Sequence, residues 1–149
     1  MNVRPCGLLM RGGAFLTLRY RYGARDRFNL PGGGGEAGES LHQTLIREFS
    51  EELQLPIQPG ELLLAGETLV GGRETLHLLF RVSASPSLEP RLDPAHTSAL
   101  ELAWLLPEDP RLAELYPALG APLGALLRGE GGTVPIYHPL LPQSWFAPA

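Results

Sequence analysis

The sequence contains no lysine, since all 12 of its basic residues are arginine. This absence excludes a P-loop, whose lysine reaches the phosphates of a bound nucleotide, and it excludes Schiff-base chemistry. There is also no nucleophile-elbow motif to support a serine hydrolase. Several common classes of enzyme are therefore ruled out.

Cysteine and long apolar runs are scarce as well. Cys6 is the one cysteine, so an internal disulfide is excluded, and its apolar surroundings predict a small buried side chain. No run is long enough to cross a membrane and no signal peptide is evident, so we expect no membrane partner and a cytoplasmic location by default. A net charge of −4 argues against a nucleic acid polymer as partner.

The 149 residues, 44% of them hydrophobic, suit a single globular domain with a real core. There is no internal repeat and no linker, so we expect one domain over residues 1–149. From about residue 129 onward the segment is rich in glycine and proline. Its apolar side chains exceed what a free tail needs (Ile136, Tyr137, Trp145 and Phe146), which predicts packing on the domain or on a second subunit and leaves a homodimer open.

The most informative segment is a glycine run followed by a helix. Ser40 and Gln43 fit a capping box that starts a helix over residues 41–53. The buried stripe repeats every four residues, with Ile46 beside it (Leu41, Leu45, Phe49 and Leu53). The glycines at 32–35 allow a tight backbone path in front of the helix.

Three carboxylates share one face of that helix. Glu48, Glu51 and Glu52 are related by three and four positions, and like charges at that spacing repel by about 0.2–0.5 kcal/mol per pair. A hard divalent cation, Mg²⁺ or Mn²⁺, would neutralise them, and a backbone carbonyl from the glycine turn could join as a ligand. The alternative for the glutamates alone is a solvated acidic helix face.

A second phosphate motif overlaps the same glycines. Gly33, Gly35 and Gly38 form a literal GxGxxG, which is typical of Rossmann folds. However, Pro31 breaks any strand directly before it, and the following helix is acidic where a pyrophosphate needs positive potential. The context therefore disfavours a dinucleotide-binding turn.

Residues 30–55 resemble the signature of the Nudix hydrolases. The resemblance lies in Gly33, Glu39, the run from Arg47 to Glu52 and Leu55 at the family's spacing, preceded by a typical lead-in from Leu30 to Gly33. One position departs, because Gln54 stands where the family usually has glycine. Glycine there would supply a left-handed cap, in which Gln costs on the order of 1 kcal/mol.

The resemblance implies a fold, an activity and a set of roles. The fold would be an α/β/α sandwich of the α+β type with a mixed β-sheet. The activity would be Mg²⁺- or Mn²⁺-dependent cleavage of a pyrophosphate in a nucleoside diphosphate linked to another moiety. Metal ligands would be Glu48, Glu51, Glu52 and the Gly32 carbonyl, and Glu39 with Arg47 would form a structural ion pair.

The general base is left open by the same resemblance. Glu48 or Glu51 is our choice, and Glu101, which precedes a strand containing Trp104, is an additional candidate base or ligand whose alternative is a structural pairing. A non-catalytic module that senses a nucleotide or nucleotide sugar on the same fold is the alternative function. ADP-ribose, a sugar nucleotide, a dinucleoside polyphosphate and a modified nucleoside triphosphate all remain possible substrates.

The remaining elements follow from apolar runs and turns. We expect a hairpin from strands 6–11 and 14–22, a polar loop over 24–29, strands over 62–70, 75–83 and 100–106, and a helix over 110–127 that Pro117 and Pro122 kink or split.

Three residues near these strands have two interpretations each. Arg19 and Arg21 share one face of the second strand, where they would contact substrate phosphates or form salt bridges on an exposed face. Phe28 would stack on a base or, more in keeping with burial habits, lie in the core.

Overall fold

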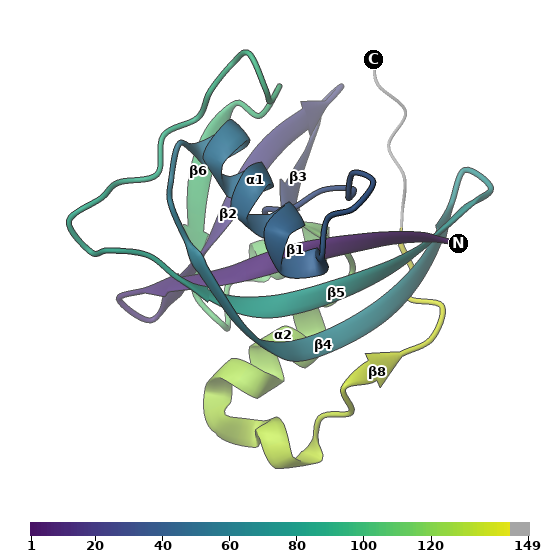
Figure 1. Ribbon diagram of the computed structural model, residues 1–149. Helices are drawn as coiled ribbons and strands as arrows, with labels where there is room; N and C mark the ends of the chain where they lie inside the picture. The colour runs from purple at the N-terminus through teal and green to yellow at the C-terminus, as the bar shows by residue number, and fades with distance from the viewer. Residues whose placement is uncertain (144–149) are drawn as a thin grey trace.

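The computed structural model describes residues 1–143, and Trp145 and Phe146 of the expected C-terminal packing lie outside this range. Helices cover both faces of one curved mixed sheet (Figure 1). The strands are β1 (Asn2–Arg11), β2 (Ala14–Tyr22), β3 (Arg25–Asn29), β4 (Gln58–Val70), β5 (Arg73–Ser83), β6 (Glu101–Leu105), β7 (Leu115–Tyr116) and β8 (Tyr137–His138). The predicted α/β/α sandwich is confirmed.

The sheet is mixed because the first strand pairs differently with its two neighbours. Its order is β7-β3-β2-β1-β5-β4-β8, with β6 added on β2. β1 runs parallel to β5 from Asn2 to Leu9 and meets β2 antiparallel only at its end, next to the expected turn at Gly12. β4 and β5 form the second expected hairpin, although β4 begins four residues before the predicted position.

Two apolar clusters lie on opposite faces of the sheet. The helix α1 (Leu41–Leu53) buries Leu45, Phe49 and Leu53 in one cluster, as the four-residue repeat predicts. The helix α2 (Gly120–Ala125) contributes Leu123 to the other cluster. Ile46 was expected beside the buried stripe, but it is 43% exposed.

The prediction of a loop at residues 24–29 was wrong. This segment is β3, which pairs antiparallel with β2 from Leu18 to Tyr22. The polar sequence did not indicate a strand, because Arg27 is buried together with Phe28 although it is charged. The Arg27 guanidinium lies 4.8 Å from the centroid of the Tyr22 ring and 4.6 Å from the centroid of the Tyr116 ring. Phe28 is therefore a core residue, as burial habits suggested.

The expected helix at residues 110–127 is split into short pieces. They are a 3₁₀ turn, η1 (Pro110–Glu114), the strand β7 and the helix α2, followed by the helical turns η2 (Leu126–Glu130) and η3 (Gly131–Thr133). The break falls at Pro117, which follows a cis peptide bond, whereas Pro122 is tolerated in the first turn of α2.

Candidate active site

The glycine turn packs directly on β1. Gly7 N donates to Pro31 O at 2.8 Å, and Gly33 N donates to Pro5 O at 3.2 Å. A Cβ atom at Gly32 would collide with the Pro5 carbonyl oxygen, so only glycine fits this approach. The turn is therefore fixed to the sheet immediately before α1 begins.

The next glycine makes room for a carboxylate. A Cβ atom at Gly33 would lie 2.6 Å from Oε1 of Glu48, so the absence of a side chain lets the Glu48 carboxylate reach the turn. The helix itself starts with the predicted capping box: Ser40 Oγ accepts from Gln43 N at 3.1 Å, and Gln43 Oε1 accepts from Ser40 N at 2.8 Å. Turn and helix thus meet at Glu48.

Arg47 is the centre of an ion-pair network that joins the turn to the helix. Its Nε donates to Glu39 Oε2 at 2.7 Å and its Nη2 donates to Gly34 O at 2.9 Å. Its Nη1 donates to Glu48 Oε1 at 3.0 Å and to Glu51 Oε2 at 3.2 Å. Arg47, together with the Glu36 N–H and the Thr44 hydroxyl, lowers the pKa of Glu39 to about 2.

Glu52 receives little of this positive charge. Burial and the neighbouring Glu48 carboxylate raise its pKa well above the usual carboxylate range, and Arg4 opposes this shift only in part. Among residues 1–143, no three His, Cys, Asp or Glu side chains form a metal-ligand group, and the Glu48 and Glu51 carboxylates contact Arg47. The Glu52 carboxyl therefore holds its proton to a higher pH than an ordinary carboxyl does.

The helix ends at the unusual Gln54. This residue has φ 51° and ψ 38°, the left-handed conformation in which glycine is favoured. Its side chain has its own contacts: Nε2 donates to Arg91 O at 3.4 Å and to Leu92 O at 3.3 Å. Gln54 thereby holds the loop between β5 and β6, which also bonds to the end of α1 through Asp93 N and Glu52 O at 3.0 Å.

The other predicted site residues form ion pairs with one another. Arg19 Nε donates to Glu101 Oε1 at 2.8 Å, and both Arg19 and Arg21 contact Asp26. The Glu101 side chain is 59% exposed. A salt-bridged strand face is thus present at these residues, and their contact with substrate phosphates stays a prediction.

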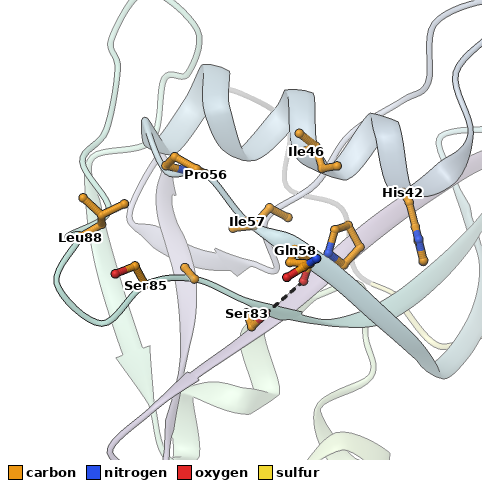
Figure 2. A pocket seen from close by; sticks show the side chains of 10 residues that line it. His42, Ile46, Pro56, Ile57, Gln58, Ser83, Ser85 and Leu88 are labelled. Atoms are coloured by element: carbon orange, nitrogen blue, oxygen red, sulfur yellow. Dashed lines mark hydrogen bonds between the residues drawn. The ribbon is translucent and has the colours of Figure 1, made fainter.

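A further hollow lies beside α1. It has a volume of about 610 Å³ and is lined by His42 and Ile46 of the helix, with Leu88 opposite (Figure 2). None of Glu48, Glu51 and Glu52 lines it. This hollow is therefore separate from the carboxylates.

Three residues that no sequence pattern indicated line a hollow that borders Gly34 and Gly35 of the glycine turn, namely Arg4, Arg73 and Tyr116. They come from β1, β5 and β7, so no local pattern joins them. An arginine at the start of an apolar strand was the one available signal, because a charged residue there needs a partner.

Comparisons with known proteins agree with this architecture. The family model of the NUDIX domain matches residues 3–125. Similar solved structures include a MutT Nudix hydrolase from Burkholderia pseudomallei, with 25% identity, 72% of this chain and 84% of that chain covered, and a TM-score of 0.62. The E. coli ORF135 protein has 24% identity, coverage of 89% and 92%, and a TM-score of 0.70.

A third similar structure is a C. elegans Ap4A hydrolase, with 20% identity, coverage of 89% of this chain and 97% of that chain, and a TM-score of 0.64. A comparison with curated proteins found no match. The matched model spans most of the chain, including the glycine turn and α1. The chain therefore belongs to the Nudix family and is one of its pyrophosphohydrolases.

Proposed function

We propose that the protein uses Mg²⁺ or Mn²⁺ to hydrolyse the pyrophosphate of a nucleoside diphosphate joined to a second moiety. The observation that carries this proposal is the carboxylate face of α1: Glu48 reaches the glycine turn at Gly33, and Glu51 and Glu52 follow it three and four positions later on the same side of the helix. Such carboxylates have no structural need to be adjacent, since their mutual repulsion costs stability. A domain that only bound nucleotides would not require all three.

The donor set fits a hard divalent cation. Carboxylate oxygens are its preferred ligands, and the Gly33 position leaves space for the Glu48 carboxylate beside the backbone. We assign Glu48, Glu51, Glu52 and the Gly32 carbonyl as ligands. A cation would compete with Arg47 for Glu48 and Glu51, whose present contacts are 3.0 and 3.2 Å.

The bound cation would lower the pKa of the attacking water and would neutralise negative charge on the phosphate oxygens. The residues of the chain perform the other tasks. Arg47, through Glu39 and Gly34, fixes the turn relative to the helix. Glu48 or Glu51 accepts the proton of the water, and Glu101 is the third candidate base.

A substrate panel tests this function. ADP-ribose, a sugar nucleotide, a dinucleoside polyphosphate and a nucleoside triphosphate are each incubated with Mg²⁺ or Mn²⁺, and products are identified by mass. From a nucleoside diphosphate that is linked to a second moiety, we expect two products: a nucleoside monophosphate and the phosphorylated second moiety. Excess EDTA should abolish turnover and added Mg²⁺ should restore it, whereas full turnover in EDTA would refute the metal assignment.

A further inference from the structure

A positively charged cleft borders the glycine turn at Gly34 and Gly35, and none of its lining residues lines the hollow of Figure 2. Two adjoining hollows of about 540 and 320 Å³ share Arg73, Thr75 and Tyr116 in their walls. The larger one also borders Gly34 and Gly35. The cleft therefore opens onto the turn that faces the α1 carboxylates.

Arg4 stands between this cleft and the turn. It precedes Pro5, whose carbonyl accepts from Gly33 N, and its own Nη2 donates to Leu30 O at 2.9 Å. Its guanidinium lies over the Tyr116 ring, 5.3 Å from the centroid. These contacts fix the orientation of the side chain at the edge of the cleft.

One nitrogen of Arg4 lacks an acceptor. Nη1 is buried and has no hydrogen-bond partner within residues 1–143. A buried guanidinium N–H without an acceptor is costly, and such groups in native proteins usually have a reason. This nitrogen is enclosed by the protein, while Arg4 as a residue lines the larger hollow, so its guanidinium places a fixed positive charge at the wall of the cleft.

The charge of the cleft selects an anion. No described residue lining either hollow is Asp or Glu, while Arg4 and Arg73 both line the larger one, in a protein whose net charge is −4. The guanidinium group matches phosphate because its N–H groups form a planar fork. The hydroxyl of Thr75 adds a donor in the same wall.

We propose that the cleft formed by Arg4, Arg73, Thr75 and Tyr116 binds a phosphate of the substrate other than the pyrophosphate that is cleaved. This inference rests on the proposed function, because it takes Glu48, Glu51 and Glu52 as the place of cleavage. The additional phosphate belongs to a longer polyphosphate chain or to a phosphate monoester on the second moiety. Substrates that carry it are preferred over those that end in a neutral sugar.

The first test measures binding without a metal ion, so that the α1 carboxylates do not attract phosphate. Inorganic triphosphate is titrated in EDTA and followed by NMR. The resonances of Arg4, Arg73 and Tyr116 should shift, and Arg73→Gln should weaken binding about tenfold, the effect of one charge-assisted hydrogen bond. Arg73 is exposed, so this variant should fold.

Matched variants separate a site from general charge effects. Arg81→Gln removes the same charge from β5 at a position paired with Glu61 at 2.9 Å, and it should leave binding unchanged. Arg4→Lys keeps the charge but loses the fork, so it should also weaken binding. Equal losses in Arg73→Gln and Arg81→Gln, or no binding at all, would overturn the proposal.

The second test uses catalysis. We compare kcat/KM for a nucleoside diphosphate sugar, the same compound with a phosphate monoester on the sugar, and a nucleoside polyphosphate. Arg73→Gln should lower the preference for whichever compound carries the recognised phosphate about tenfold and should hardly affect the neutral sugar. An equal loss of kcat/KM for all three compounds would refute phosphate recognition by the cleft but not the proposed hydrolysis. If none of the compounds were cleaved while the protein still bound triphosphate, only the proposed hydrolysis would be refuted.

Discussion

At the scale of single residues, the acids of the α1 region divide into two groups according to what neutralises them. Glu39 is held by Arg47 at 2.7 Å, and Arg47 contacts Glu48 and Glu51 as well. Glu52 is half-buried beside Glu48 and forms no ion pair with an arginine of residues 1–143. Glu39 is therefore expected to serve stability, and Glu52 to serve cation binding.

Glu52→Gln keeps the volume of the side chain and removes an anionic oxygen. We expect turnover to fall by more than about 100-fold and the affinity for Mn²⁺ to fall with it, because a hard ligand is lost. Steady-state kinetics and calorimetric Mn²⁺ titration measure both, with the exposed Glu61→Gln as the control. Near-wild-type turnover and metal affinity in Glu52→Gln would refute its role as a ligand.

Glu39→Gln should instead lower the melting temperature while leaving the carboxylates of the helix face in place. Because the folded pKa of Glu39 is about 2, below its ordinary value of 4.5, its contribution to stability is complete above pH 4.5 and is lost as the pH falls toward 2. Calorimetry at pH 7 and pH 3 should therefore show a smaller difference between variant and wild type at pH 3. A difference independent of pH would indicate packing rather than charge.

Gln54→Gly removes a left-handed Gln, which relieves about 1 kcal/mol of strain. It also removes two long hydrogen bonds to the loop at Arg91 and Leu92 and loosens the unfolded chain, effects of similar size and opposite sign. We expect little change in stability but faster tryptic cleavage after Arg91, measured by limited proteolysis. Asn tolerates the left-handed conformation but has a shorter side chain, so Gln54→Asn should also be cleaved faster by trypsin after Arg91. If Gln54→Gly were strongly stabilised and its tryptic cleavage were unchanged, the contacts of Gln54 with the loop would be unimportant.

At the scale of elements, sequence predicted best where one local signal was sufficient. The capping box and the four-residue apolar repeat placed both ends of α1. β3 was missed because its buried arginine is stabilised by Tyr22 and Tyr116, and Tyr116 is distant in sequence. Likewise, the pairing of Arg19 with Glu101 joins β2 to β6, which no local pattern reveals.

The β4–β5 hairpin contains a buried histidine with a consequence for stability. Burial, assisted by Arg4, lowers the pKa of His77 to about 3 from an ordinary 6.5, and Thr68 Oγ1 lies 2.9 Å from its Nε2. Below pH 6.5 the unfolded chain gains a proton at this residue that the folded chain does not. As the pH falls below 6.5, this residue alone should therefore reduce the free energy of unfolding by up to about 1.4 kcal/mol per pH unit.

Denaturant unfolding between pH 6.5 and pH 5 measures this slope. His77→Gln cannot gain the proton, so its stability should depend less on pH over this range than that of the wild type. The exposed His42→Gln serves as the matched control and should retain the wild-type slope. Equal slopes in wild type and His77→Gln would mean that His77 is protonated without cost in the folded state.

At the scale of the whole molecule, the candidate site was predictable only in part. The glycine turn and the three glutamates lie within one continuous segment, so their spacing could be read directly. The cleft beside them draws Arg4, Arg73 and Tyr116 from three strands that meet only in the folded sheet. Within residues 1–143, none of the helices has the length and hydrophobicity needed to cross a bilayer.

The C-terminal segment was expected to pack on the domain or on a second subunit, and its described part packs on the domain. β8 runs parallel to β4, with Ala65 N donating to Ile136 O at 2.8 Å and Leu141 N donating to Glu67 O at 2.7 Å. The Leu141 side chain covers Gly66, where an added Cβ would lie 2.5 Å from its Cδ1. The segment thus covers what would otherwise be an exposed strand edge.

Deletion of residues 135–149 should therefore uncover the edge of β4. The matched Nudix region ends at residue 125, so the shortened chain should still fold, but with a lower melting temperature and a tendency to associate through the free edge. Thermal unfolding and size-exclusion chromatography with light scattering measure these two effects. Leu141→Ser keeps the backbone pairing and loses only the apolar contact, so it should lower the melting temperature less and stay at the wild-type size. If the deletion left both quantities unchanged, the pairing of β8 with β4 would contribute nothing to stability, and its role would lie elsewhere.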